Sequence, residues 1–176
     1  STTPLFVNIG KNRDTELEHA GQDYIKLAKK FRDVADALVV NISSPNTPGL
    51  RNLAQVAYLQ AWLGQVIQIA APKPVLLKLS PDMSDEDLKN TALFAVKEGI
   101  SGFILTNTTL SRPTDSPFPV EGGVSGQPLK ERSLRALQNL LTILGAQRSS
   151  LLIISGGGVM TAADVFDRLS KGADLV

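Results

Sequence analysis

Polar residues that could hold a small ligand follow five short apolar runs along this 176-residue chain. The polar groups are Asn8, residues 41–47, Lys78, residues 106–109 and residues 155–158. They offer amides, hydroxyls, glycine backbone and a single ammonium, so they supply hydrogen-bond donors and acceptors with little fixed charge. Such a set suits a planar ligand with amide and imide edges.

Each group also has a simpler interpretation. Asn and Ser are common in turns and at helix starts, and Lys78 could extend its ammonium to solvent. The glycines at residues 156–158 fit a plain strand-to-helix turn, or else a phosphate cradle built from backbone amides. His19 is placed on a helix surface and given no role. Five successive runs that all end in this way favour a shared site.

The apolar runs have the composition of buried parallel strands. They cover residues 5–9, 37–42, 75–79, 102–105 and 151–154, and residues 174–176 begin another. Continuous Val, Ile and Leu without polar alternation is typical of strands that are covered on both faces.

Segments of helical period separate the strands. The first carries residues 17–31 and is predicted to open with a capping box formed by Thr15 and Glu18. The second is predicted as one helix over residues 53–70. The third starts at Ser84 and ends at Gly99, the fourth carries residues 134–144, and the fifth lies between Thr161 and Gly172.

Strands and helices that alternate at this spacing predict an α/β fold with right-handed βαβ units and a parallel sheet. Two architectures remain open: a doubly wound open sheet and an arc of a (β/α)8 barrel. Both bind ligands at the carboxyl ends of the strands, where the polar groups lie. Residues 111–128 are rich in Pro and Gly, and they are long enough to form an active-site loop.

Composition excludes several classes of site. The net charge is +1 and no basic cluster stands out, which argues against nucleic acid as a partner. The chain has no cysteine and one histidine, so neither a disulfide nor a cysteine nucleophile is possible, and no metal site is predicted. No apolar run approaches the ~18 residues that a membrane span needs.

Seven blocks of the chain resemble the dihydroorotate dehydrogenases, in the order expected for that family. They are VNIGKN at residues 7–12, NISSPNTPGLR at 41–51, LKLSPD at 77–82, TNTT at 106–109, GGVSGQPL at 122–129, GGV at 157–159 and KGADLV at 171–176. The second and fourth blocks are specific, whereas glycine turns alone are weak evidence. A small departure is Ser155–Gly156, where the family usually has glycine and then an aliphatic residue.

The resemblance implies an FMN-containing TIM barrel that oxidises (S)-dihydroorotate to orotate in pyrimidine (UMP) biosynthesis. Ser44 would be the catalytic base. The family branch with a cysteine at this position is excluded, which leaves the branch that passes electrons to a quinone. The residues expected to contact FMN are Asn8, Asn41, Lys78, Thr106, Gly126 and Gly158, and those expected to hold the substrate are Asn41, Asn46, Asn107 and Thr108.

The family layout also implies that residues 1–176 form one incomplete FMN-binding domain, with barrel strands three to eight. The first two strands and the end of the eighth would lie outside this chain. So would the segment that docks on the inner membrane, either the bacterial cytoplasmic face or the mitochondrial membrane. An open barrel has raw sheet edges. The 176 residues alone are therefore expected neither to fold stably nor to hold FMN, and to be inactive.

Two other functions remain as alternatives. One is another FMN-dependent oxidoreductase, acting on a dihydropyrimidine or a dihydrouridine, although the serine–proline–asparagine block argues against it. The other is a barrel fragment without catalysis. Such a fragment would be expected to lose Ser44, Lys78 or Asn107, and all three are present.

Overall fold

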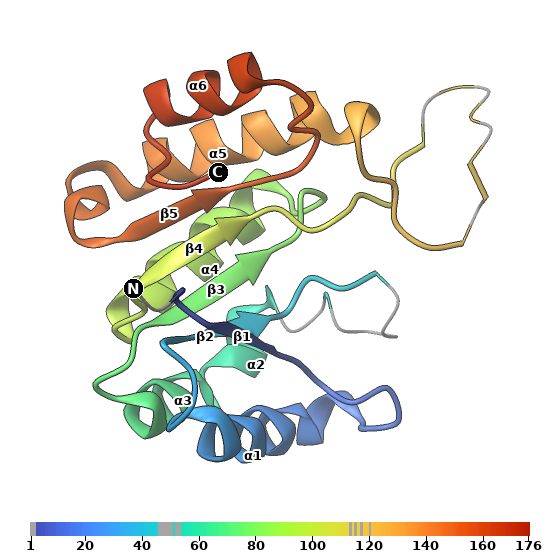
Figure 1. Ribbon diagram of the computed structural model, residues 1–176. Coiled ribbons are helices and arrows are strands. Elements are labelled where there is room, and N and C mark those ends of the chain that lie inside the picture. The colour runs from blue at the N-terminus through green and yellow to red at the C-terminus, as the bar shows by residue number, and fades with distance from the viewer. Residues whose placement is uncertain are drawn as a thin grey trace.

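The computed structural model describes residues 3–45, 51, 54–112, 114, 116, 118–119 and 121–176. Five parallel strands form one sheet in the order of the sequence (Figure 1). The strands are β1 (Phe6–Ile9), β2 (Ala37–Asn41), β3 (Val75–Leu79), β4 (Gly102–Leu105) and β5 (Leu152–Ser155). Each strand therefore agrees with a predicted apolar run to within one residue at either end.

Helices connect successive strands. They are α1 (Ala20–Phe31), α2 (Val56–Leu59), α3 (Leu63–Ala70), α4 (Asp85–Lys97), α5 (Lys130–Leu144) and α6 (Ala162–Ser170), with 3-10 turns η1 (Leu17–His19), η3 (Gln127–Leu129) and η4 (Gly145–Ser150). Near the C-terminus, Leu175 forms a parallel bridge to Ile154, as expected for the start of a further strand.

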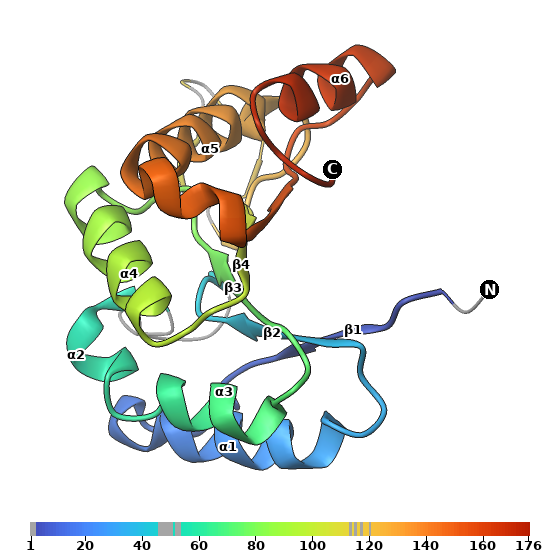
Figure 2. The same ribbon diagram turned by 90° about the vertical axis from the view of Figure 1, so that its left-hand side faces the viewer.

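The strand order decides between the two architectures that the sequence left open. A doubly wound sheet reverses direction at a switch point and carries helices on both faces. Here neighbouring strands are always consecutive, and α1, α3, α4 and α5 cover one side of a curved sheet (Figure 2). The fold is thus an arc of a (β/α)8 barrel, and the sheet face away from these helices is the barrel interior.

Alternate strand residues are divided between the two faces. Val40, Leu77, Phe103 and Ile153 belong to the main apolar core between sheet and helices. Because side chains alternate along a strand, their neighbours in sequence point into the barrel. Two predicted ligand-binding residues, Asn41 and Lys78, are among those neighbours.

The predicted helix over residues 53–70 is wrong in its continuity. Residue 53 lies outside the described part of the chain, and the rest is divided into α2 and α3. The break occurs at Trp62, whose φ of −150° is not helical. Its buried indole stacks on the ring of Tyr24 from α1, with centroids 4.3 Å apart and planes 4° from parallel.

The helix ends were predicted with mixed success. The capping box at Thr15 and Glu18 is wrong, because η1 intervenes and α1 begins only at Ala20, with no side-chain cap. Two other caps are confirmed. Ser84 accepts a hydrogen bond from the backbone of Asp87, and Thr161 forms a reciprocal capping box with its third helical residue.

Candidate functional site

Asn41 and Lys78 lie side by side at the carboxyl edge of the sheet. They are register partners on β2 and β3, and both are half-buried on the interior face of the arc. Asn8 on β1 is the register partner of Val39, which lies two residues before Asn41 on β2. Asn8 therefore lies on the same face, further from the carboxyl edge, and it is exposed. Within the part of the chain that the structure describes, the ammonium of Lys78 has no hydrogen-bond or ion-pair partner. The lysine is thus free to serve a ligand.

The buried Ser43 connects the loops that follow β2 and β4. Its hydroxyl and its backbone N–H both donate to Oδ1 of Asn41, at 2.9 and 3.1 Å. Nδ2 of Asn107 donates to Oγ of Ser43 at 3.2 Å, and Oδ1 of Asn107 accepts from the N–H of Thr108 at 2.8 Å. These bonds fix which way both side-chain amides face. Asn41 therefore presents N–H donors to a ligand, whereas Asn107 retains one donor and one acceptor.

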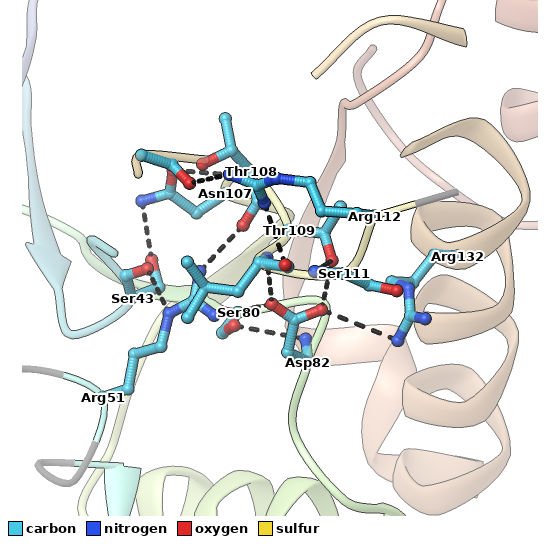
Figure 3. A network of polar contacts seen from close by, with 12 residues as sticks. Ser43, Arg51, Ser80, Asp82, Asn107, Thr108, Thr109, Ser111, Arg112 and Arg132 are labelled. Carbon is cyan, nitrogen blue, oxygen red and sulfur yellow. Dashed lines mark hydrogen bonds and ion pairs between the residues drawn. The ribbon is translucent and has the colours of Figure 1, made fainter. Parts of the chain in front are cut away.

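Arg51 joins the loops that follow three strands (Figure 3). Its Nε donates to the carbonyl of Ser43 at 3.2 Å, and one terminal nitrogen donates to Oδ2 of Asp82 at 2.6 Å. The other terminal nitrogen donates to the carbonyl of Thr108 at 2.8 Å. Because the guanidinium is a planar fork with five donors, a single side chain can hold β2, β3 and β4 loop segments in one geometry.

Asp82 is the acceptor at the centre of this network. Besides Arg51, it accepts from the hydroxyl of Thr109 and from the backbone N–H of Leu110 at 2.7 Å, and Arg132 of α5 lies 3.6 Å away. Burial on its own would raise the pKa of Asp82. The hydrogen bonds from Thr109, Leu110 and Arg51 outweigh burial and hold this pKa below its ordinary value. The carboxylate is therefore ionised at neutral pH.

The loop predicted at residues 111–128 is closed at its base. Thr109 and Val124 form an antiparallel bridge, with N–H to carbonyl distances of 3.0 and 2.8 Å. Arg112 donates to the carbonyl of Gly122 at 2.8 Å across the same neck. Since Thr109 also bonds to Asp82, the base of the loop is fastened directly to the network.

The structure describes the positions of the proposed base, Ser44, and of Gly126, but not that of Asn46. Ser44 directly follows Ser43 and is half-buried at the same rim as Asn41. Gly126 lies in the turn before η3, and its carbonyl accepts from Leu129 at 3.0 Å. Asn46 lies outside the described residues, so its predicted contact with substrate stays a prediction.

Thr106 carries a polar atom that the fold leaves without a partner. Among the described residues, its Oγ1 is the only buried side-chain oxygen or nitrogen with no hydrogen bond. Its backbone N–H donates to the carbonyl of Gly156 at 3.0 Å, which joins the end of β4 to the glycine turn after β5. A buried hydroxyl without a partner is costly. This position is therefore suited to a polar group supplied by a ligand.

The turn at residues 156–158 is shaped by glycine. Gly158 has a φ of +71°, and a Cβ there would lie 2.5 Å from the Cα of Lys130, so no other residue fits without a shift. Within the described chain, the backbone N–H groups of Gly157, Gly158 and Val159 donate to no acceptor. Consecutive free amides at a glycine turn form a concave site for an anion.

Tyr24 supports the rim from the helix layer. Its hydroxyl donates to the backbone carbonyl of Asn41 at 2.8 Å. Burial is the main cause that raises the pKa of Tyr24 well above its ordinary value, so the hydroxyl remains protonated and a donor. The stack with Trp62 holds the ring in this position.

Sequence reasoning gave no role to Arg51, Asp82 or Arg168, and it gave Ser43 only a weak part in assisting Ser44. Ser43, Arg51 and Asp82 lie inside the recognised blocks, so the blocks were the available signal. Arg168 has no such signal, because a lone arginine on a helix is normally exposed. In the structure it is 2% exposed and bonds to the glycine turn.

The described residues contain no group of three or more His, Asp or Glu side chains that could hold a metal ion. No helix among them is long and apolar enough to cross a membrane. What the rim does provide is a hydroxyl, oriented amides, a lysine and a glycine turn with free amides.

Comparison with known proteins gives a consistent result. The family described as dihydroorotate dehydrogenase matches residues 1–176. Two proteins named dihydroorotate dehydrogenase (quinone) are similar over almost all of the chain. One from Thermus thermophilus is 45% identical over 98% of this chain and 49% of its own length. That of Mycolicibacterium vanbaalenii is 42% identical over 100% of this chain and 50% of its own length.

Solved structures give the same answer for the fold. Ligand-free DHODH from Eimeria tenella superposes with a TM-score of 0.86 at 32% identity, covering 99% of this chain and 53% of that one. DHODH from the same organism in complex with ferulenol gives 0.84 at 32% identity, covering 98% and 51%. The chain thus spans about half the length of the relatives it matches.

Proposed function

Because the chain belongs to the dihydroorotate dehydrogenase family, we propose that the protein oxidises (S)-dihydroorotate to orotate in pyrimidine biosynthesis. The observation that carries this proposal is the set of oriented amides at one rim. Ser43 fixes Asn41 and Asn107 so that they present both N–H donors and a carbonyl acceptor. A ring imide and a carboxylate need this combination of partners.

We assign the role of base to Ser44. The reaction removes a proton from the carbon next to a carbonyl and a hydride from the adjacent carbon, leaving a double bond. The Oγ of Ser44 would accept the proton. A neutral hydroxyl is a weak base, so Ser44 needs its proton passed on through water or a hydroxyl, and proton removal should require a higher pH than with a thiol at this position.

FMN is the proposed cofactor, and a bound flavin would accept the hydride. Three features on the interior side fit this group. The ammonium of Lys78 would balance negative charge on the reduced ring, and Oγ1 of Thr106 needs a hydrogen-bond partner. The free amides around Gly158 suit a phosphate. Asn8, Asn41 and Gly126 complete the proposed set, and Asn46 and Thr108 join Asn41 and Asn107 around the substrate.

The electrons would pass to a quinone, as the names of the relatives imply for those proteins. We propose that the protein reaches the quinone at the inner membrane through a segment that is not in this chain. Dihydroorotate, orotate and a quinone are then its small-molecule partners.

Anaerobic single-turnover reduction of the flavin tests the assignment of Ser44. In the intact protein, Ser44→Ala should slow reduction by dihydroorotate about 10²- to 10⁴-fold, the usual contribution of a positioned base. Ser44→Cys should remain active with its pH profile moved to lower pH. Ser149→Ala, which changes an exposed serine of η4, should behave as the unchanged protein.

The same assay separates this proposal from its rivals. A Ser44→Cys profile that overlays that of the unchanged protein would remove Ser44 as the base. Reduction by a dihydrouridine or a dihydropyrimidine, with none by dihydroorotate, would overturn the substrate. A protein that contains no flavin would favour a barrel without catalysis.

A further inference from the structure

Arg168 is a buried cation that lies beneath the glycine turn. It comes from α6, which lies beside α5 and above β5 (Figure 1), and only 2% of it is exposed. Its guanidinium donates to Oγ of Ser155 at 2.7 Å, to Oγ of Ser133 at 2.7 Å and to the carbonyl of Gly157 at 2.6 Å. All three partners are neutral.

The charge of Arg168 is not matched by an adjacent carboxylate. Across residues 3–176, apart from the undescribed positions, no Asp or Glu oxygen forms an ion pair with it. Asp164 and Asp167 of the same helix act on Arg168 only through space, without a direct ion pair, and they are paired with Lys130 and Lys171 instead. Burial of a guanidinium without a counter-ion is unfavourable. The structure therefore retains a cation at a position where it costs stability.

The geometry of the turn explains what this cation does. The carbonyl of Gly157 is drawn inward by both Arg168 and Ser133, the latter at 2.7 Å. In a planar trans peptide the carbonyl and the following N–H point in opposite directions. The N–H of Gly158 consequently faces away from Arg168, and it is the central one of the three amides without an acceptor.

We propose that Arg168 is the positioning residue of the phosphate subsite: it holds the glycine turn with its amides turned outward, and its unpaired charge attracts the anion bound there. This inference rests on the proposed function, because it takes the phosphate of FMN as the anion. Where little solvent is present, the attraction between two charges is only weakly screened. A cation behind the turn therefore attracts an anion in front of it. A bound phosphate would be the direct counter-ion that Arg168 lacks among the described residues.

Arg148, in η4 before β5, offers a matched control for Arg168, which lies in α6 after β5. It also pins backbone carbonyls, those of Leu151 at 2.8 Å and Gly172 at 2.7 Å, but it is paired with Asp174 at 2.7 Å. Arg148 thus combines the structural role of Arg168 with a charge that is already balanced. Replacing it should lower stability and leave the phosphate subsite unchanged.

The test compares FMN with riboflavin, which has the same ring system and no phosphate. Apoprotein is prepared from the intact protein, and both dissociation constants are measured by quenching of flavin fluorescence. In Arg168→Gln, FMN should bind about 10- to 100-fold more weakly, as expected when one charge contact at a partly buried site is lost. Riboflavin should change by less than about 2-fold. Arg148→Gln should leave the ratio of the two constants unchanged, although its melting temperature falls.

A second variant covers the case in which Arg168→Gln does not fold. Arg168→Lys keeps the charge and loses the fork, so the preference for FMN over riboflavin should fall by about 3- to 10-fold. An unchanged preference in Arg168→Lys, or equal weakening of both flavins in Arg168→Gln, would overturn the positioning role. If the unaltered protein binds neither flavin, the proposed function is overturned as well. If the unaltered protein binds FMN, a failure of the Arg168 variants to behave as expected counts against the role of Arg168 alone.

Discussion

Removal of the Asp82 carboxylate should open the network that joins the strand-end loops. In Asp82→Ala, Arg51, Thr109 and Leu110 each lose an acceptor, and the guanidinium of Arg51 stays largely buried, because its side chain is only 19% exposed. Hydrogen bonds to a charged group contribute about 1.5–3 kcal/mol each, but these three share one side chain and water replaces part of the loss. We therefore expect the closed loop to lose about 2–4 kcal/mol in total.

Asp82→Asn separates charge from hydrogen bonding. Its amide oxygen can occupy the position of Oδ2 and keep the bonds from Arg51 and Leu110, and its NH2 group can donate to the hydroxyl of Thr109. The charge facing Arg51 and Arg132 is lost, and the hydroxyl of Thr109 changes from donor to acceptor. Because Asp82 and Arg51 are both about one-fifth exposed, that loss should amount to about 1 kcal/mol.

Amide hydrogen exchange measures the opening directly. In Asp82→Ala the N–H groups of Leu110 and Val124 should exchange about 100-fold faster, since 1.4 kcal/mol corresponds to tenfold. Asp87→Ala is the control, because Asp87 is an exposed carboxylate that, like Asp82, accepts from a side-chain hydroxyl, that of Ser84 at 2.7 Å. Equal exchange at Leu110 in the two variants would refute the role of Asp82 as the anchor of the loops.

Three further outcomes are expected. Because folding lowers the pKa of Asp82, its stabilising contribution is complete above the ordinary pKa of about 4 and is lost as the pH falls through the lowered value. The difference in unfolding free energy between the unchanged protein and Asp82→Asn, measured by urea titration, should therefore become smaller in acid. Trp62→Ala should lower the free energy of unfolding by about 3–5 kcal/mol, and Trp62→Phe by less, because the buried stack on Tyr24 is lost; equal urea midpoints for all three proteins would contradict this. Gly158→Ala should abolish tight FMN binding through its contact with Lys130, with circular dichroism showing whether the fold persists.

Features set by neighbouring residues were predictable from the sequence. The caps at Ser84 and Thr161 depend on residues three positions away, and both are confirmed. The location of Asn41, Lys78 and Asn107 at one rim followed from a general property of parallel sheets, namely that their carboxyl ends meet at one edge. The choice between a barrel and a doubly wound sheet required strand order, which local periodicity does not contain.

Features set by distant partners were not predictable. The break before α3 occurs at Trp62, which stacks on Tyr24 of another helix, and the period of the apolar residues gave no sign of it. The partners of Arg51 lie in other loops, so its role became visible only with the loops assembled. Arg168 was missed because an arginine on a helix is normally exposed. Arg168 points inward, whereas Phe166 is 73% exposed.

The consecutive order of the strands has a consequence for synthesis of the protein. Every strand after β1 pairs with the strand made just before it, so each new unit meets a finished edge as it leaves the ribosome. Assembly in this order keeps the chain separation between pairing partners short, which favours rapid closure. At each stage the newest strand has one edge unpaired, and that edge is where a chaperone or a second nascent chain would attach.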